Sequence, residues 1–128
     1  MRKLIIIGIG LVLLIVAFLL VRQHFRPPSD AEIRQKVPGS WTRERSKAIW
    51  NFAPDGSWFL SHPSSRTNSG YGGTWQIKDS VLIMTFTNSH VIRGNSLVGG
   101  VVPWKIIHVD DRQIVYVESG ETNTWKRQ

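Results

Sequence analysis

The segment NFAPDGSWFL, residues 51–60, says most about the fold, because it reads as a tight turn between two aromatic-rich strands. Pro54 presets φ, the carboxylate of Asp55 can cap its own backbone, and Gly56 accepts a positive φ. The flanking segments 48–53 and 57–62 carry the aromatic and branched residues that strands favour. We therefore expect a β-hairpin here, with Gly56 in the left-handed region.

The same pattern continues from residue 39 to the end of the chain. Turn-forming breaks recur at 78–80, 110–111 and 119–121. The strand-like segments are 40–45, 48–53, 57–62, 71–78, 81–87, 101–109, 112–118 and 122–127. With no helical stretch between them, they predict an all-β domain: a small antiparallel meander of about eight strands, closed into a barrel or flattened into a sandwich. Closure is favoured because an open sheet would leave two unpaired edges.

Alternation along the strands assigns each one an inner face, because successive side chains point to opposite sides. The residues assigned to the inner faces are Trp50, Phe52, Trp58, Leu60, Trp75, Ile77, Leu82, Met84, Phe86, Trp104, Ile106, Ile114 and Tyr116. All six tryptophans follow residue 40. Core filling explains them simply, since each can bury on the order of 200 Å². The alternative is that two or three line a cavity mouth for an apolar or aromatic ligand.

A short motif, G-[ST]-W, occurs three times at a spacing of 17 residues, ending at Trp41, Trp58 and Trp75. Seventeen residues are about one strand pair with its turns. A shared local solution explains the repeat better than duplication does, with a glycine leaving each turn and a tryptophan entering the core two positions later.

These motifs together resemble the short bacterial lipocalin-like domains over roughly residues 37–128. The resemblance rests on the G-[ST]-W motifs, the turn at 55–56, the segment 82–84 and the closing Trp125-Lys126-Arg127. It implies a calycin-type barrel in which Trp41 packs at the closed end beneath a basic side chain, either Arg127 or Lys126. It also implies a binding role rather than an activity. The domain is much shorter than a full lipocalin and has no disulfide.

The N-terminus has a different composition: residues 4–21 contain no charged or polar side chain. As a helix they would reach about 27 Å, close to the hydrocarbon thickness of a bilayer. A cleaved signal peptide is the alternative, but the run ends without a small-residue cleavage site. We therefore expect a transmembrane signal-anchor in residues 1–26 and a single-pass membrane protein that contacts membrane lipid through this helix.

Charge near the anchor leaves its orientation open. Two basic residues precede the run and four follow it within residues 22–36, which by the positive-inside rule would keep the domain in the cytoplasm. The usual fate of such a short leader is to stay inside and send the domain out. We expect an extracytoplasmic domain in a bacterial envelope.

A joint of residues 27–37 links the anchor to the barrel domain, residues 38–128. Ser29 and Glu32 fit a capping box, so a short helix is expected, with a solvated linker as the alternative. Ile33 and Val37 share one face of that helix and could lie over an open end of the barrel. Residues 38–128 carry ten basic and seven acidic groups, and this small, interspersed excess argues against a nucleic acid partner.

No residue set predicts catalysis. The chain has no cysteine, its four histidines lack metal-ligand spacing, and there is no nucleophile-turn motif. Asp110 and Asp111 are adjacent, which suits a turn better than a pair of converging carboxylates. We therefore expect that the protein is not an enzyme and that it binds neither a metal nor a cofactor.

Two glycine-rich connections, 62–73 and 88–100, are the candidate recognition loops. We predict ligand contacts from Trp58, Trp75, Tyr71, Arg66, Trp104 and Arg93. The basic stretch 42–47 is expected to be a solvated hairpin. The leading hypothesis is a non-catalytic binding module that holds a small amphiphilic or apolar ligand, or an envelope component, at the barrel mouth. The alternative is a filled barrel that docks another envelope protein through its loops or outer face.

Overall fold

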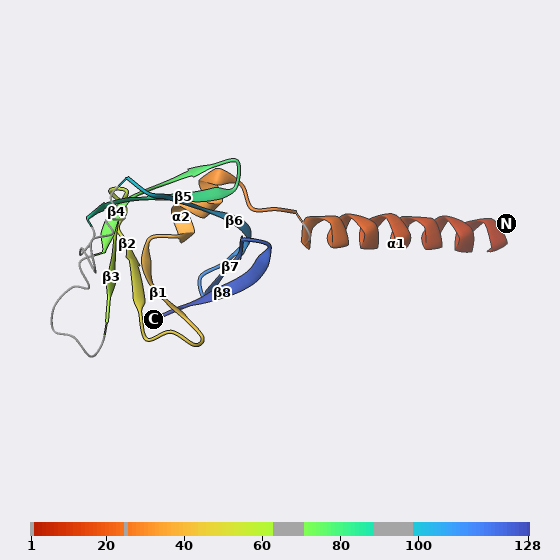
Figure 1. The fold of residues 1–128 in the computed structure, drawn as a ribbon. Coiled ribbons are helices and arrows are strands. Elements are labelled where there is room, and N and C mark those ends of the chain that lie inside the picture. The colour runs from red at the N-terminus through yellow and green to blue at the C-terminus, as the bar shows by residue number, and fades with distance from the viewer. Residues whose placement is uncertain (1, 25, 63–70, 89–98) are drawn as a thin grey trace.

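The computed structural model describes residues 2–24, 26–62, 71–88 and 99–128, which form two helices and eight strands (Figure 1). The helices are α1 (Arg2–His24) and α2 (Asp30–Lys36). The strands are β1 (Gly39–Arg43), β2 (Ile49–Phe52), β3 (Ser57–Ser61), β4 (Gly72–Lys78), β5 (Val81–Asn88), β6 (Val101–Val109), β7 (Gln113–Glu118) and β8 (Glu121–Arg127).

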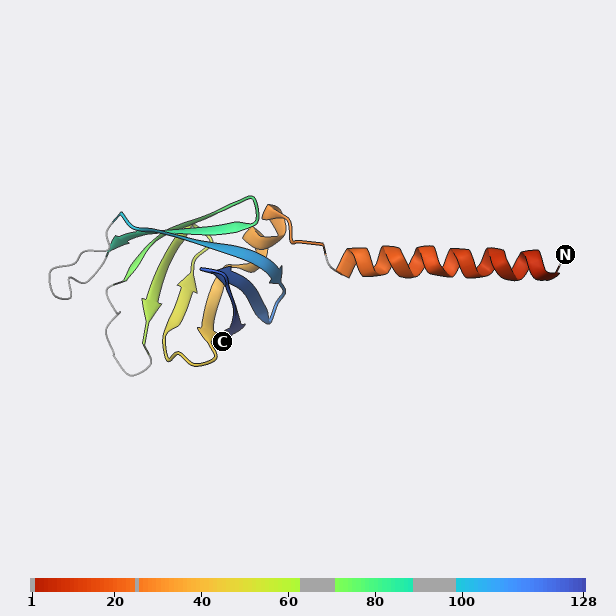
Figure 2. The same cartoon turned by 45° about the vertical axis from the view of Figure 1, so that its right-hand side comes forward.

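The strands form one closed antiparallel barrel in the order β1 to β8, which confirms the predicted meander (Figure 2). Each strand pairs with the next in sequence, and β8 returns to pair with β1 through Trp41↔Arg127, Thr42↔Lys126 and Arg43↔Trp125. The hairpin predicted at residues 51–60 is confirmed as well. Gly56 has a φ of 88°, and the Ser57 amide donates to Asp55 Oδ1 at 2.9 Å. Closure satisfies the backbone groups that an open sheet would leave at its edges.

The barrel interior is filled by aromatic and aliphatic side chains. Every residue assigned to an inner face from the sequence is either buried in the core or packed against it. The largest fully buried side chains also include Trp125, which is not among those assigned residues. The indole rings contact one another directly, with ring centroids 4.7 Å apart for Trp104 and Trp125 and 5.4 Å apart for Trp50 and Trp58. Such edge-to-face and offset contacts add to the free energy gained from burial.

Because the strands alternate in direction, the turns fall into two sets at opposite ends of the barrel. The β2–β3, β4–β5 and β6–β7 turns share one end with α2, which we call the closed end. The β1–β2 and β7–β8 turns lie at the other, which we call the open end. Helix α2 begins with the expected capping box between Ser29 and Glu32. Ile33 and Val37 are both 0% exposed in the barrel core, so the prediction that this helix covers one end of the barrel is confirmed.

Polar contacts tie α2 to the β4–β5 turn. Asp79 and Ser80 both have positive φ, 55° and 60°, although neither is glycine. The two carboxylate oxygens of Asp30 accept from their amides, at 3.1 Å for Asp79 and 2.7 Å for Ser80. The Ser80 hydroxyl donates to the Pro28 carbonyl at 2.8 Å, and Arg34 donates to the Ile77 carbonyl at 2.9 Å. These contacts therefore hold the β4–β5 turn in a backbone conformation that Asp79 and Ser80 themselves disfavour.

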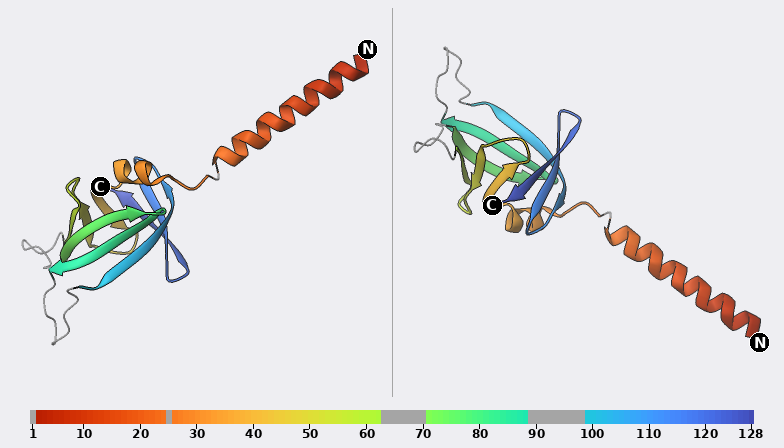
Figure 3. Two further views of the ribbon diagram at one scale, coloured as in Figure 1. Left: turned by 90° about the horizontal axis from the view of Figure 1, so that it is seen from above. Right: turned by 90° about the horizontal axis from the view of Figure 1, so that it is seen from below.

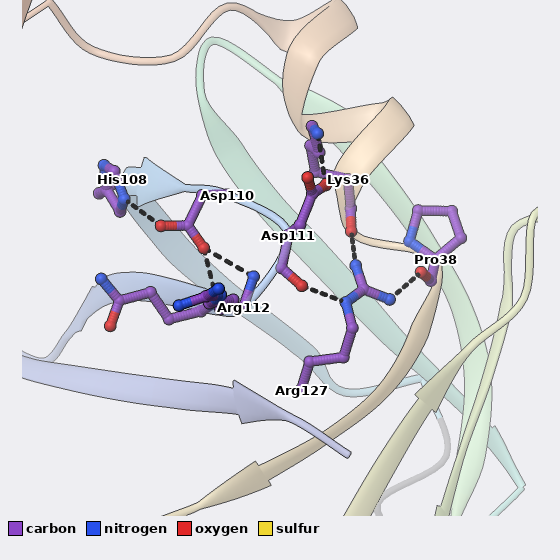
Figure 4. Close-up of polar contacts among 8 residues, drawn as sticks. Lys36, Pro38, His108, Asp110, Asp111, Arg112 and Arg127 are labelled. Atoms are coloured by element: carbon purple, nitrogen blue, oxygen red, sulfur yellow. Dashed lines mark hydrogen bonds and ion pairs between the residues drawn. The ribbon is translucent and has the colours of Figure 1, made fainter.

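Arg127 closes the same end (Figure 4). Its guanidinium lies over the Trp41 ring, 4.1 Å from the centroid, so Arg127 rather than Lys126 fills the basic role implied by the lipocalin-like resemblance. It also donates to the carbonyls of Asp111, Pro38 and Lys36 at 2.8, 3.1 and 2.8 Å. One side chain thus joins β8, the end of α2 and the β6–β7 turn. Lys126 instead faces outward and pairs with Glu44 at 3.6 Å.

Helix α1 extends away from the barrel in all views (Figures 1, 2 and 3). Its described large apolar side chains, from Ile9 to Val21, are all exposed, from 46% at Val16 to 70% at Leu14. Among the described residues, no helix combines the length and apolar character required of a membrane-crossing helix.

Candidate functional site: the open end of the barrel

Each strand has one inner-facing residue that lies nearest to the open end of the barrel, and these residues line that end. Four of these are apolar: Trp50, Leu60, Phe86 and Val102. They pack against the core but are only partly buried, in contrast to the fully buried residues under α2. Tyr71 joins this group through a ring contact with Phe86 at 6.5 Å. We call Trp50, Leu60, Tyr71, Phe86 and Val102 the apolar mouth.

Two tryptophans form the floor of the apolar mouth. Trp58 is 2% exposed, and its ring lies 5.4 Å from that of Trp50 and 4.9 Å from that of Phe86. Trp104 lies 5.2 Å from Trp50, edge to face. Within the described part of the chain, the indole N–H groups of Trp104 and Trp125 are buried without a hydrogen-bond partner. Buried donors usually have a partner, so these two N–H groups stand out.

A polar corner made by Arg43, Glu118 and Asn123 interrupts the apolar lining. Arg43 donates to the Asn123 side-chain oxygen and lies 4.0 Å from the Glu118 carboxylate. The same corner opens onto a groove of about 540 Å³ at the rim of the barrel. That groove is lined by Arg43, Glu44, Arg45, Ser46, Thr122, Asn123 and Thr124. An apolar mouth with one charged corner suits a ligand that has both an apolar and a polar part.

Tyr116 lies beneath this corner, and burial raises the pKa of its phenol from 10 to about 12. The nearby Arg43 acts in the opposite direction on that pKa, and Glu118 raises it further. The neutral phenol is therefore favoured in the folded protein. Because the folded pKa is raised, this contribution to stability is complete below pH 10 and is lost as the pH rises from about 10 to about 12.

We predict that the free energy of unfolding falls across this alkaline range by at most about 2–3 kcal/mol through Tyr116. The measurement is urea unfolding at a series of pH values, comparing the natural chain with Tyr116→Phe, which lacks the titrating group. The chain has only two tyrosines, so ultraviolet titration of Tyr71→Phe reports Tyr116 alone. Ionisation of Tyr116 near pH 10 in that variant would contradict the prediction.

The structure brings together some of the predicted ligand contacts and separates others. Trp58, Trp104 and Tyr71 lie in or beneath the apolar mouth. Trp75 lies toward the closed end, where its N–H donates to the Ala53 carbonyl at 3.0 Å and its ring contacts Phe52. The predictions for Arg66 and Arg93 lie outside the described residues.

The polar corner differs from what the sequence pattern predicts. The stretch 42–47, which contains Arg43, is expected to be a solvated hairpin, but only Arg45, Lys47 and neighbouring residues of that turn are exposed. The available signal is parity: Arg43 follows Trp41 by two positions, and Asn123 precedes Trp125 by two. Both therefore point to the inside of the barrel.

At the closed end, Asp110 and His108 form an acid–histidine pair beside the β6–β7 turn. Asp110 accepts from the Arg112 and Gln113 amides at 2.7 and 2.8 Å, and its other oxygen lies 3.0 Å from His108 Nε2 (Figure 4). The hydrogen bond with His108, together with these amides, lowers the pKa of Asp110 to about 2. Asp111 instead pairs with Lys36. These contacts cap the β6–β7 turn, and no three metal-ligating side chains gather anywhere in the described ranges.

A closed eight-stranded meander, capped by a short helix and by an arginine over a tryptophan, defines a lipocalin-like barrel. Solved structures have the same fold. A lipocalin-like protein from Bacteroides uniformis matches with a TM-score of 0.55 at 12% identity, covering 71% of this chain and 97% of its own. An uncharacterised protein from Bacteroides eggerthii matches with a TM-score of 0.55 at 14% identity, covering 71% and 98%. No protein-family model and no curated protein matches the sequence.

Proposed function

We propose that the protein is a non-catalytic binding module that holds the apolar part of a small amphiphilic ligand in the apolar mouth of its barrel. The observation that carries this proposal is the cluster of partly exposed, inner-facing apolar side chains at the open end, opposite the end of the barrel that α2 covers. Apolar surface left accessible inside a concave site is where a ligand gains binding free energy.

The polar corner supports an amphiphilic ligand with an acceptor or anionic group. Arg43 is partly exposed, at 42% for its side chain, and its ion pair with Glu118 has the long distance of 4.0 Å. A carboxylate or phosphate on the ligand would give this guanidinium a closer anionic partner. The unpartnered N–H groups of Trp104 and Trp125 are two further donors in the interior.

Anchoring to a membrane completes the proposal. The run of residues 4–21 is free of polar side chains, and α1 exposes large apolar groups on all its faces between Ile9 and Val21. A helix that is apolar all round requires an apolar environment. We place the barrel outside the cytoplasm, at the surface of a bacterial envelope membrane. We assign it no catalytic residues, because the pair formed by Asp110 and His108 caps a turn.

The ligand site is tested with a panel of fatty acids, lysolipids and apolar fluorophores, using native mass spectrometry and tryptophan quenching on the full chain in detergent. Val102→Asn places an amide in the apolar mouth, and we expect at least about tenfold weaker binding, equivalent to ~1.4 kcal/mol. Val101→Asn is the matched control, because Val101 is its neighbour in β6 and is 58% exposed on the outside. Equal effects of the two variants would contradict the site.

A second candidate function is docking of another envelope protein by a filled barrel. The observation in its favour is the packing of Trp50, Trp58, Trp104, Trp125 and Tyr116 in ring contact across the interior. In that case no member of the panel would quench the indoles, and a pull-down with the full chain would recover one stoichiometric partner.

A further inference from the structure

The barrel is joined to α1 by a very short connection. Helix α1 ends at His24, and by Pro28 the chain is already fastened to the barrel, because the Pro28 carbonyl accepts from the Ser80 hydroxyl at 2.8 Å. Four residues, even fully extended, span at most about 14 Å. Whatever environment α1 occupies, the β4–β5 turn therefore stays within that distance of its end.

The fastening is rigid as well as short. Asp30 accepts from two turn amides, Arg34 donates to the Ile77 carbonyl, and Arg127 donates to the carbonyl of Lys36, the last residue of α2. Ile33 and Val37 are buried in the same core as the strands. Helix α2 therefore moves with the barrel. The connection between α1 and Pro28 is too short for the barrel to invert relative to the end of α1.

All of these contacts are at the closed end, opposite the apolar mouth. A barrel whose longest strand has nine residues and whose strands tilt by about 40° is ~20–25 Å tall. We infer that the barrel stands on the membrane with its closed end down, so the apolar mouth opens some 20 Å or more above the surface. It therefore takes its ligand from the aqueous phase, not directly from the bilayer that anchors it. This inference rests on the proposed anchoring and names the source of the ligand.

The absence of cysteine from the sequence makes single-cysteine labelling of the full chain straightforward. Lys78→Cys lies beside the β4–β5 turn at the closed end, and Lys47→Cys lies in the β1–β2 turn at the open end. Both side chains are exposed lysines, so the two variants are matched in charge. Each is labelled with a fluorophore and reconstituted into vesicles that carry a nitroxide on the lipid headgroups.

We expect headgroup quenching at position 78 to exceed that at position 47 by at least about threefold, because the height of the barrel separates the two sites. Equal quenching, or stronger quenching at position 47, in vesicles that carry the protein would overturn the orientation alone. Failure of the full chain to float with vesicles would overturn the anchoring and the orientation together. Ligand binding in detergent is measured separately, so it stands or falls on its own.

A lengthened connection tests the cause. Inserting about 20 Gly and Ser residues between Arg26 and Pro27 gives a flexible span of roughly 25 Å, comparable to the height of the barrel, and the quenching at the two positions should then converge. An unchanged ratio would show that the short connection does not set the orientation, which would overturn the inference.

The source of the ligand is tested with a fluorescent fatty acid already dissolved in the vesicles that carry the protein. Loading of the barrel should be no faster than desorption of the same probe from protein-free vesicles. Faster loading would mean direct entry from the bilayer and would overturn the inference.

Discussion

Replacing Trp41 by alanine is expected to lower the free energy of unfolding by about 3–5 kcal/mol, enough to unfold a domain of this size. Trp41 is 0% exposed, its N–H donates to the Val37 carbonyl at 2.7 Å, and its ring lies beneath the Arg127 guanidinium. The substitution removes a large core side chain, a link to α2 and the surface on which Arg127 rests. Urea unfolding followed by circular dichroism measures the loss.

Trp41→Phe is the matched control for this prediction. It keeps an aromatic face for Arg127 and loses the N–H donor with part of the ring, so a smaller loss of about 1–2 kcal/mol is expected. A loss below about 1 kcal/mol for Trp41→Ala would show that the contact between Trp41 and Arg127 does not hold the closed end together.

Gly73→Ala is expected to destabilise the barrel by about 3 kcal/mol or more, at or above the upper end of the usual range for overpacking. A Cβ atom at residue 73 would lie 1.7 Å from the Thr85 carbonyl oxygen and 2.9 Å from the Thr87 amide nitrogen. Both are backbone atoms of β5, so no side chain can move aside. The pairing of β4 with β5 shifts register at Gly72 and Gly73, and the added methyl would push the two strands apart there. The midpoint of urea unfolding is the measurement.

Gly120→Ala provides the comparison. Gly120 has a φ of 84°, and a methyl group added there would meet no other atom of the described residues within 4 Å. That variant introduces only left-handed backbone strain, about 1–2 kcal/mol. If Gly73→Ala loses no more stability than Gly120→Ala, then β4 and β5 do not approach each other as closely at residue 73 as the structure has them.

The order, number and inner faces of the strands could be predicted from the sequence because each rests on local rules. Alternation with a period of two assigns Trp50 and Leu82 to inner faces without any knowledge of their neighbours. Turn chemistry placed Gly56 at a positive φ. The helix over one end was predicted from its own capping box and from Ile33 and Val37.

The contacts that fix the ends of the barrel could not be predicted, because they join distant residues. The left-handed pair Asp79 and Ser80 is held by Asp30, 49 and 50 residues earlier, and nothing in the local sequence of the turn indicates that partner. The choice between Lys126 and Arg127 needed the register of β8 against β1, which puts Arg127 opposite Trp41. Parity with Trp41 indicates the inward direction of Arg43, but its partner Asn123 lies 80 residues away and could not be predicted.

The clustering of indole rings inside the barrel has an optical consequence. Trp50, Trp104 and Trp125 lie with ring centroids 4.7–5.6 Å apart, at fixed interplanar angles of 35–76°. Chromophores this close share their electronic excitations, so the far-ultraviolet circular dichroism of the barrel should contain an exciton couplet on top of its sheet spectrum. Trp104→Phe removes the indole contacts with Trp50 and Trp125 and should weaken the couplet while leaving the sheet signal unchanged, so the couplet reports native packing directly.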